Sequence, residues 1–138
     1  MRTSSRAVVI EDNKLLTMFR RKIKDGVKKE YFVIPGGGLE EGETLEQNVV
    51  RELAEEMNVD VKILGYLGKT EDEELCQHYF HCEIVKGTPH LGGEELERMT
   101  ESNYYKPTFV EIEDIENIDI FGIEFVKKAL RKEYVKNK

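Results

Sequence analysis

Residues 35–59 carry the strongest structural pattern in the chain, PGGGLEEGETLEQNVVRELAEEMNV. Three glycines follow a proline, and a glutamate-rich segment comes next. Within that segment, Thr44 and Gln47 form a capping-box pattern, which is typical of a helix start. Apolar residues then recur at every fourth position, namely at Leu45, Val49, Leu53 and Met57. This spacing predicts an amphipathic helix over residues 44–57.

Three carboxylates share one side of the predicted helix. Because each helical residue advances by about 100°, Glu55 lies about 60° to one side of Glu52 and Glu56 about 40° to the other. Like charges held this close raise each other's pKa unless a cation neutralises them, and hard carboxylate oxygens prefer Mg²⁺, Mn²⁺ or Ca²⁺ to zinc. A glutamate-rich helix face is more often simply solvated. Here the adjacent Arg51 and the glycine turn, whose backbone a phosphate can approach, favour a metal site.

The segments before this helix predict strands. Apolar runs at residues 6–11 and 14–21 flank Asp12-Asn13, which indicates a hairpin. Residues 30–34 predict a short buried strand that stops at Pro35, because proline cannot donate to a ladder.

The segments after the helix complete the pattern. They predict strands at residues 61–69, 75–86 and 107–112, a polar loop over 87–104, and a final helix over 122–135. The apolar face of that last helix is predicted to hold Ile123, Val126 and Leu130. This order indicates an α+β fold, with a mixed sheet covered by helices.

Size and composition limit the function. The chain has 138 residues, 36% of them charged, with a net charge of −7, so we expect a single domain over residues 1–138. The negative charge argues against a general nucleic-acid or membrane binder, and we expect neither a DNA nor a membrane partner. Without an apolar run long enough for a signal peptide or a membrane span, we expect a cytoplasmic protein. Cys76 and Cys82 are about 20 Å apart along one predicted strand and cannot form a disulfide.

The run Gly37-x5-Glu43-x7-Arg51-Glu52-Leu53-x-Glu55-Glu56-x-Asn58-Val59 resembles the Nudix box of the MutT-like Nudix hydrolases. Eight of the nine fixed positions of the family pattern agree over these 23 residues. Asn58 is the exception, because it stands where the family has glycine. Asparagine is the next-best residue for a left-handed helix cap, so we expect the turn to survive.

The resemblance implies an α/β/α sandwich, the Nudix fold, and divalent-metal-dependent hydrolysis of a nucleoside diphosphate linked to another group. By position, Glu52 and Glu56 would be the principal ligands of Mg²⁺ or Mn²⁺, with Glu55 as a further ligand. Arg51 would orient the glutamates, and Glu43 would be its ion-pair partner.

Family members differ in their general base and in their substrate contacts. The base would be Glu52 or a loop carboxylate, for which Glu94 and Glu95 are the candidates. An equally good interpretation is that both glutamates are simply solvated in a polar loop. Arg20, whose position is often basic in relatives, and the glycines of residues 36–38 would contact substrate phosphates. The carbonyl of Gly36 or Gly37 would add a metal ligand.

The resemblance leaves the substrate open. ADP-ribose hydrolases tend to have a proline at a fixed distance after the box, and this chain has none there. One class of dinucleoside polyphosphate hydrolases has a tyrosine after the box, at positions that Cys76 and Gln77 occupy in this chain. A (deoxy)nucleoside triphosphate is therefore the leading prediction. The basic stretch at residues 20–29 keeps an RNA 5′-end pyrophosphohydrolase as an alternative, and a non-catalytic nucleotide sensor is the other. A homodimer is possible, since dimers are common among relatives.

Several residues outside the box have two interpretations each. Tyr31 or Phe32 could stack on a base, although Phe32 shares a strand face with Ile34 and is predicted to be core. Tyr104 and Tyr105 could form a base-binding wall or anchor a loop. His78 and His81 lack a metal-ligand pattern and are predicted to pack or to lie exposed at a sheet edge. The C-terminal cations are attributed to the helix dipole rather than to RNA binding; they are Lys127, Lys128, Arg131, Lys132, Lys136 and Lys138.

Overall fold

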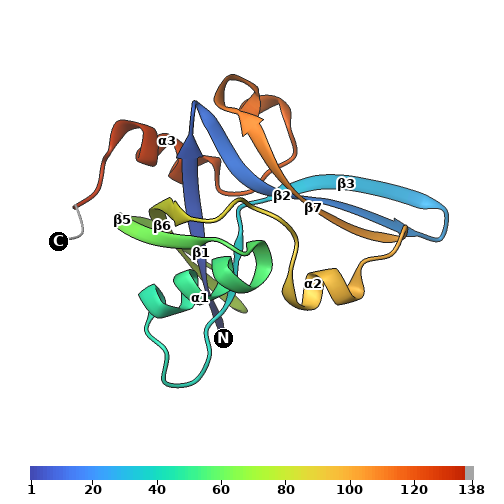
Figure 1. The fold of residues 1–138 in the computed structure, drawn as a ribbon, viewed down its shortest axis with the longest axis horizontal. Coiled ribbons are helices and arrows are strands. Elements are labelled where there is room, and N and C mark those ends of the chain that lie inside the picture. Colours follow the sequence, from blue (N-terminus) through green and yellow to red (C-terminus); the bar gives the residue numbers. More distant parts are fainter. Residues whose placement is uncertain (136–138) are drawn as a thin grey trace.

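Seven strands and four helical segments make up residues 1–135, the part of the chain that the computed structural model describes (Figure 1). Lys136 and Lys138 lie outside the described residues. The strands are β1 (Arg2–Glu11), β2 (Lys14–Lys24), β3 (Val27–Val33), β4 (Gly36–Gly38), β5 (Asp60–Glu71), β6 (Leu75–Lys86) and β7 (Asn103–Glu111). The helices are α1 (Leu45–Met57), α2 (Gly93–Arg98), the 3₁₀ helix η1 (Ile112–Asn117) and α3 (Ile123–Arg131).

The strands form one mixed sheet, as predicted. Its order is β3-β2-β1-β6-β5, with β4 paired to β1 and β7 paired to β2. β1 and β6 run parallel, and the other pairs are antiparallel. β1 therefore joins two parts of the sheet, one that holds β4, β5 and β6 and one that holds β2, β3 and β7.

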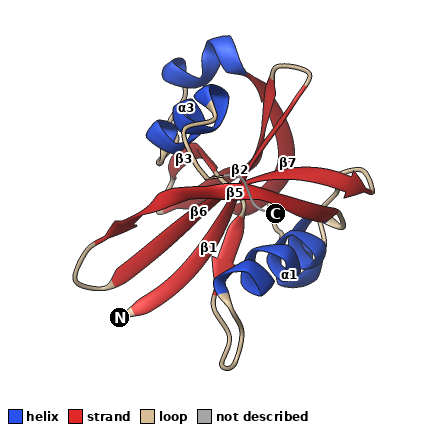
Figure 2. Ribbon diagram, turned by 90° about the vertical axis from the view of Figure 1, so that its left-hand side faces the viewer, coloured by secondary structure: helices blue, strands red, loops and turns tan. Residues whose placement is uncertain are grey.

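Side-chain alternation gives this sheet two apolar faces. On β1, Ala7 and Val9 point into a core under α1, whereas Val8 points into a second core under η1 and α3. α1 fills the first core with Val49 and Leu53. Figure 2 shows α1 and α3 on opposite sides of the strands, which is the α/β/α arrangement.

Local signals set the ends of α1 and of the first hairpin. Thr44 and Gln47 form the predicted capping box, and Asn58 takes the left-handed C-cap with φ 55°. Asp12 and Asn13 have φ values of 50° and 62°, which match the twist of a tight hairpin. The predicted capping box, left-handed cap and hairpin turn are therefore all confirmed.

Three predicted elements were wrong. The loop over residues 87–104 contains α2, which buries none of its side chains and so shows no apolar period. β3 is longer and more exposed than the buried strand predicted over residues 30–34, because it runs from Val27 to Val33, and Gly36–Gly38 form a further strand, β4, directly after Pro35. The final helix stops at Arg131 rather than at residue 135.

The predicted apolar face of the final helix also needs correction. Its buried residues are Phe125, Val126 and Ala129, and Leu130 is exposed. The Phe125 ring stacks on Tyr79, with centroids 4.1 Å apart, and this contact selects the face that α3 turns to the sheet.

The remaining sequence predictions concern separate side chains. Both cysteines are free and buried. His78 Nδ1 is 2.8 Å from the Tyr66 hydroxyl, and His81 Nδ1 is 2.6 Å from the Tyr134 hydroxyl, so both histidines pack as predicted. Within residues 1–135, no helix has the length and apolar character needed to cross a membrane.

Candidate active site

Two of the three glycines of β4, Gly36 and Gly37, are required by close contacts on opposite sides of the strand. A side chain on Gly36 would bring its Cβ to 2.0 Å from the carbonyl oxygen of Ser5, and a Cβ on Gly37 would lie 2.5 Å from the Glu52 carboxylate. A Cβ on Gly38 would meet nothing within 4 Å. Gly36 therefore allows β4 to pair with β1, and Gly37 gives room to a glutamate of α1.

Asn48, which the sequence analysis did not select, ties β4 to α1. It is fully buried, and its Nδ2 donates to the carbonyl oxygens of Gly37 and Gly38 at 3.2 and 3.1 Å. Ser5 adds a second link, because its hydroxyl donates to the carbonyl oxygen of Leu45 at 3.0 Å. The glycine strand and the helix that carries the glutamates are thus held as one unit.

Arg51 is the centre of an ion-pair network. Its Nε and Nη2 donate to the two carboxylate oxygens of Glu43, at 2.6 and 3.0 Å. Its Nη1 donates to Glu52 at 3.0 Å and to Glu55 at 3.1 Å, and its Nη2 also reaches the carbonyl oxygen of Gly38 at 2.9 Å. Such a paired, fork-like contact fixes geometry as well as charge.

The pKa values at this end of the cluster follow from the pairing. The hydrogen bond from Arg51 lowers the pKa of Glu43, and the same contact holds the pKa of Arg51 above its usual range. Glu43 and Arg51 are therefore both charged. The Glu55 side chain is 55% exposed and turned to the same guanidinium.

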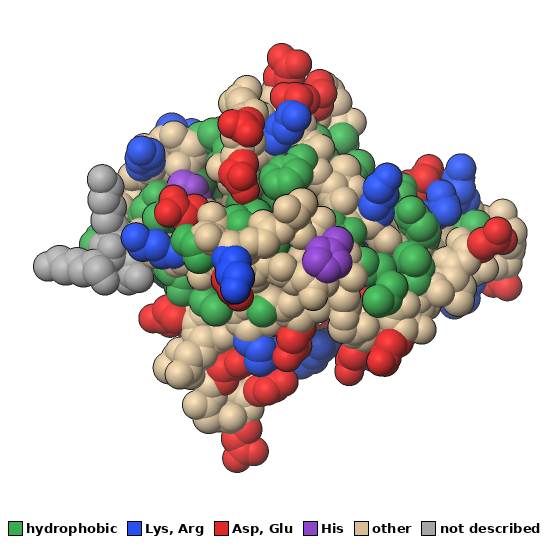
Figure 3. Space-filling model, viewed as in Figure 1, with side chains coloured by type: hydrophobic (Ala, Val, Ile, Leu, Met, Phe, Trp, Pro, Cys, Tyr) green, Lys and Arg blue, Asp and Glu red, His purple; other side chains and the backbone are tan. Residues whose placement is uncertain are grey.

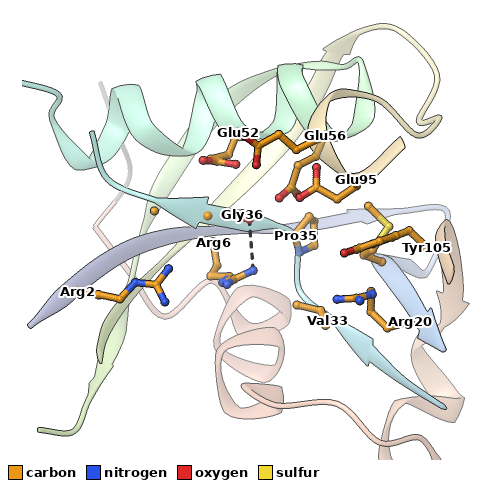
Figure 4. Close-up of a pocket in the computed structure, with 14 residues that line it drawn as sticks. Arg2, Arg6, Arg20, Val33, Pro35, Gly36, Glu52, Glu56, Glu95 and Tyr105 are labelled. Carbon is orange, nitrogen blue, oxygen red and sulfur yellow. Dashed lines mark hydrogen bonds between the residues drawn. The ribbon is translucent and has the colours of Figure 1, made fainter. Parts of the chain in front are cut away.

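The other end of the cluster has the opposite character. Burial raises the pKa of Glu56 to about 8, with further contributions from the negative charges of Glu95 and Glu52. Burial also raises the pKa of Glu52, against the lowering effect of Arg51. Figure 4 shows the side chains of Glu52, Glu56 and Glu95 directed into a common space beside Gly36.

α2 delivers Glu95 to this space, because its start is bound to the end of α1. The Gly92 amide donates to the carbonyl oxygen of Glu56 at 2.9 Å, and Asn58 Nδ2 donates to the carbonyl oxygen of His90 at 3.0 Å. A Cβ on Gly92 would lie 2.6 Å from Asn58 Nδ2, so only glycine allows this approach. The loop before α2 is therefore fixed on α1.

The two candidate loop carboxylates differ in their surroundings. Glu95 acts on the pKa values of both Glu52 and Glu56. Glu94 is 74% exposed and forms an ion pair with Arg98 at 3.0 Å. The structure thus brings Glu95 rather than Glu94 into close interaction with the cluster, although both border the cavity described next.

A cavity of about 450 Å³ lies between the carboxylates and a group of arginines. It includes Gly36, Gly37 and Gly38, and its carboxylate wall is formed by Glu52, Glu56, Glu94 and Glu95. The cationic wall is formed by Arg2, Arg6 and Arg20. A cavity of this size and polarity can hold a nucleotide-sized anion when a cation bridges it to the carboxylates.

Arg20 lies at the opening of the cavity toward β7. Its guanidinium is 3.7 Å from the centre of the Tyr105 ring, and Nη2 donates to Asn103 at 2.7 Å, whereas its buried Nε has no partner. Tyr105 therefore supports an arginine that faces the cavity. Tyr104, on the other side of β7, stacks with Arg21 at 4.6 Å.

Arg6 lines the cavity although the sequence analysis did not select it. It donates to the carbonyl oxygens of Ile34 and Gly36 at 3.0 and 3.4 Å and to Gln77 at 2.9 Å (Figure 4). Its partners are mostly backbone oxygens, which leave no residue pattern, so only the alternation of β1 could have indicated its side of the sheet.

The donor set fits a hard divalent cation by its chemistry. Within residues 1–135, no three His, Cys, Asp or Glu side chains are arranged so that they could hold a metal ion as they stand. Glu52 and Glu55 are instead bonded to Arg51. Glu52, Glu56 and Glu95 nevertheless repel one another in a partly buried space, and a cation would remove that repulsion.

Comparisons with known proteins agree with this architecture. The family model described as the NUDIX domain matches residues 1–128. The ADP-ribose pyrophosphatase of Methanocaldococcus jannaschii is 41% identical over 61 residues, which cover 44% of this chain and 34% of that protein. The match therefore spans about a third of the length of this curated relative.

Solved structures with the same fold are more distant in sequence. A NUDIX hydrolase from Nitrosomonas europaea has a TM-score of 0.74 at 16% identity, covering 98% of this chain and 92% of that one. A MutT NUDIX hydrolase from Burkholderia pseudomallei has a TM-score of 0.66 at 16% identity, covering 94% and 95%. At such identities the likeness shows the fold alone.

Proposed function

The chain belongs to the Nudix family, and on that premise we propose that it is a pyrophosphohydrolase that uses a divalent cation to cleave a nucleoside diphosphate linked to another group. The observation that carries the proposal is the convergence of Glu52, Glu56 and Glu95 beside the glycines of β4. A partly buried carboxylate cluster is costly for a protein unless a cation neutralises it. A pyrophosphate is also negatively charged, so one cation can neutralise both the carboxylates and the pyrophosphate.

Each residue of the cluster has a proposed role. Glu52 and Glu56 would hold Mg²⁺ or Mn²⁺, with Glu55, Glu95 and the carbonyl oxygen of Gly37 as further donors. When bound, the cation supplies charge neutralisation and Lewis acidity for in-line attack of water on a phosphorus. Glu52 or Glu95 accepts the proton of the attacking water.

The surrounding residues position this reaction. Arg51 Nη1 holds Glu52 in place by donating to its carboxylate at 3.0 Å, and Glu43 fixes Arg51 through the paired contact at 2.6 and 3.0 Å. The backbone of Gly36, Gly37 and Gly38 gives close access to a substrate phosphate, and Arg20 contacts the anion from the other wall of the cavity. Arg51 is therefore a positioning residue in this proposal.

A nucleoside triphosphate is the proposed substrate. It is the class that remains after the missing subfamily residues are considered, and the cavity between carboxylates and arginines suits a compact polyphosphate. ADP-ribose is the second candidate, because the relative from M. jannaschii is named an ADP-ribose pyrophosphatase. A nucleotide sensor without catalysis is the rival class.

A phosphate-release assay tests this proposal. The panel holds canonical and oxidised nucleoside triphosphates, ADP-ribose, nucleotide sugars, dinucleoside polyphosphates and 5′-triphosphorylated RNA, each with Mg²⁺ or Mn²⁺. Glu52→Gln is the inactive variant, and Glu46→Gln removes the same charge from an exposed position of α1. We expect cleavage of one class by the parent and by Glu46→Gln but not by Glu52→Gln. Nucleotide binding without any cleavage would favour the sensor.

A further inference from the structure

The strands β2, β3 and β7 form an arm that projects from the rest of the sheet (Figure 1), and Lys and Arg side chains are among those exposed on it (Figure 3). Arg20 lines the cavity, and Lys22 and Lys24 follow it at alternate positions of β2. Because side chains alternate along a strand, these three residues share one face of the arm. It is the face of Met18, which also lines the cavity.

β3 adds a fourth cation to this face. Lys29 lies directly opposite Lys22 in the β2–β3 pairing, and Tyr31 lies opposite Arg20. The Lys29 ammonium and the Arg20 guanidinium are 5.6 and 5.9 Å from the centre of the Tyr31 ring, so both strands direct these side chains to the same side. We call Arg20, Lys22, Lys24 and Lys29 the cationic ladder.

Fold stability does not explain the ladder. Like charges directly opposite each other in an antiparallel pair are destabilising, as Lys22 and Lys29 are here. Across residues 1–135, no carboxylate forms an ion pair with Lys22, Lys24 or Lys29. On the other face of the same arm, by contrast, Lys28 pairs with Glu30 at 3.7 Å. The ladder therefore keeps its charge available in a protein whose net charge is −7.

The spacing and the aromatic neighbours of the ladder indicate what it can bind. Alternate residues of a strand are about 7 Å apart, so Arg20, Lys22 and Lys24 form a regular row that an extended chain of phosphates can follow. Tyr31, beside Arg20 and Lys29, adds a ring on which a base can stack, whereas the Tyr105 ring is covered by Arg20. A cationic row with aromatic platforms is the usual means of binding single-stranded nucleic acid.

We propose that the ladder binds the phosphodiester backbone of a single-stranded RNA whose 5′-polyphosphate end occupies the cavity. This inference rests on the proposed function, and it replaces the free nucleoside triphosphate as the substrate with an RNA that carries the same terminal phosphates at its 5′ end. A nucleoside triphosphate and a triphosphorylated RNA present the same terminal group to Glu52 and Glu56. They differ in the chain that follows the first nucleoside, and only that chain reaches Lys22, Lys24 and Lys29.

Fluorescence anisotropy with 3′-labelled oligouridylates that carry a 5′-monophosphate tests the ladder without any cleavage. We expect binding in Mg²⁺ to strengthen with oligomer length until the ladder is covered. For four phosphate contacts, the logarithm of the binding constant should fall with the logarithm of salt concentration with a slope of about −3. The triple variant Lys22→Gln/Lys24→Gln/Lys29→Gln should reduce the steepness of this slope by about 2.

A matched variant removes the same charge elsewhere. Lys28→Gln/Lys69→Gln/Lys127→Gln replaces three lysines that each have an ion-pair partner off the ladder, and it should bind RNA like the parent. Equal binding by the ladder variant, the matched variant and the parent would overturn the inference. Circular dichroism and urea unfolding of both variants confirm that each is folded.

Cleavage rates then separate this inference from the proposed function. With 5′-triphosphorylated RNA, the ladder variant should lose at least about tenfold in kcat/KM, and with GTP it should match the parent. Absence of all cleavage would contradict the proposed function. The salt dependence of binding would still show whether the cationic ladder binds RNA. A DNA oligomer of the same length distinguishes RNA recognition from general phosphate binding, and tighter binding of DNA than of RNA would count against an RNA substrate.

Discussion

Glu43 and Glu56 belong to the same glutamate-rich segment and lie at opposite ends of one cluster, yet their environments differ completely. Glu43 shares two hydrogen bonds with Arg51, which lower its pKa. Glu56 is raised to a pKa of about 8 by burial and by the charges of Glu95 and Glu52. One end of the cluster is neutralised within the protein, and the other end is not.

The difference shows how one segment can provide both support and reactivity. Arg51 neutralises Glu43 and its neighbouring carboxylates. Its Nη2 also donates to the carbonyl oxygen of Gly38, and this bond links the neutralised end of the cluster to β4. Among residues 1–135 no cation forms an ion pair with Glu56, and burial outweighs the lowering of its pKa by the charge of Arg6 and by a backbone hydrogen bond from Gly36. A divalent cation bound at Glu56 would neutralise that end of the cluster, as Arg51 neutralises the other end.

Glu56→Gln should produce the largest effect, because it removes a proposed ligand at the unneutralised end. We expect kcat/KM for the preferred substrate to fall by more than about 100-fold, since even partners outside the ligand shell are worth about 10–100-fold. The measurement is steady-state hydrolysis in Mg²⁺. Glu46→Gln, on an exposed part of the same helix, serves as the control. Comparable rates for the two variants would remove Glu56 from the site.

The raised pKa of Glu56 predicts how stability depends on pH in the metal-free protein. The folded state holds this proton up to about pH 8, whereas the unfolded carboxyl releases it near its ordinary pKa of 4.5. Stability should therefore fall as pH rises between these values, by at most about 1.4 kcal/mol per pH unit for one group. Saturating Mg²⁺ should oppose the loss.

Urea unfolding of the parent and of Glu56→Gln across this pH range isolates the contribution. The comparison is needed because burial lowers the pKa values of His78 and His81, which makes the protein more stable as pH rises through their range. The difference in unfolding free energy between parent and variant should decline with pH. A constant difference would mean that Glu56 is not held protonated.

Arg51→Met tests the neutralised end by removing the shared cation. Glu43 and Glu52, which are only 12% and 14% exposed, would lose their counter-charge, and we expect a loss of about 2 kcal/mol in the free energy of unfolding. Chemical denaturation at neutral pH measures it. Arg98→Met breaks the exposed pair with Glu94 and should cost less than about 1 kcal/mol. If the two variants were equally stable, the network around Arg51 would have no special importance.

Glu95→Gln and Glu94→Gln test whether the unneutralised end of the cluster, around Glu56, includes a carboxylate from α2. Because Glu95 interacts with Glu52 and Glu56 while Glu94 pairs with Arg98, we expect about a tenfold fall in kcat for Glu95→Gln and a smaller change for Glu94→Gln. Single-turnover rates at saturating Mg²⁺ make the comparison. The reverse order would reassign the loop carboxylate to Glu94.

The sequence was sufficient where the interactions are local. The capping box at Thr44 and Gln47 and the left-handed cap at Asn58 depend on neighbours within a few residues, so their pattern could be recognised. The angular positions of Glu52 and Glu56 follow from helix geometry once α1 is known. For the same reason the hairpin at Asp12 and Asn13 was predictable.

The sequence was insufficient where distant segments meet. α2 is short and buries no side chain, and its position depends on hydrogen bonds from Gly92 and Asn58 that only the folded chain provides. Arg6 and Asn48 bind backbone carbonyl oxygens, which every residue has, so no residue pattern indicates these contacts. The sequence left the choice between Glu94 and Glu95 open for this reason as well.

Binding of Mn²⁺, followed by electron paramagnetic resonance of the free ion, tests the central claim most directly. The claim is that the unneutralised end of the cluster, at Glu56, holds the divalent cation. We predict that the parent and Glu46→Gln bind Mn²⁺ equally well and that Glu56→Gln binds it at least about tenfold more weakly. Binding of Mn²⁺ by Glu56→Gln with the affinity of the parent would contradict the claim.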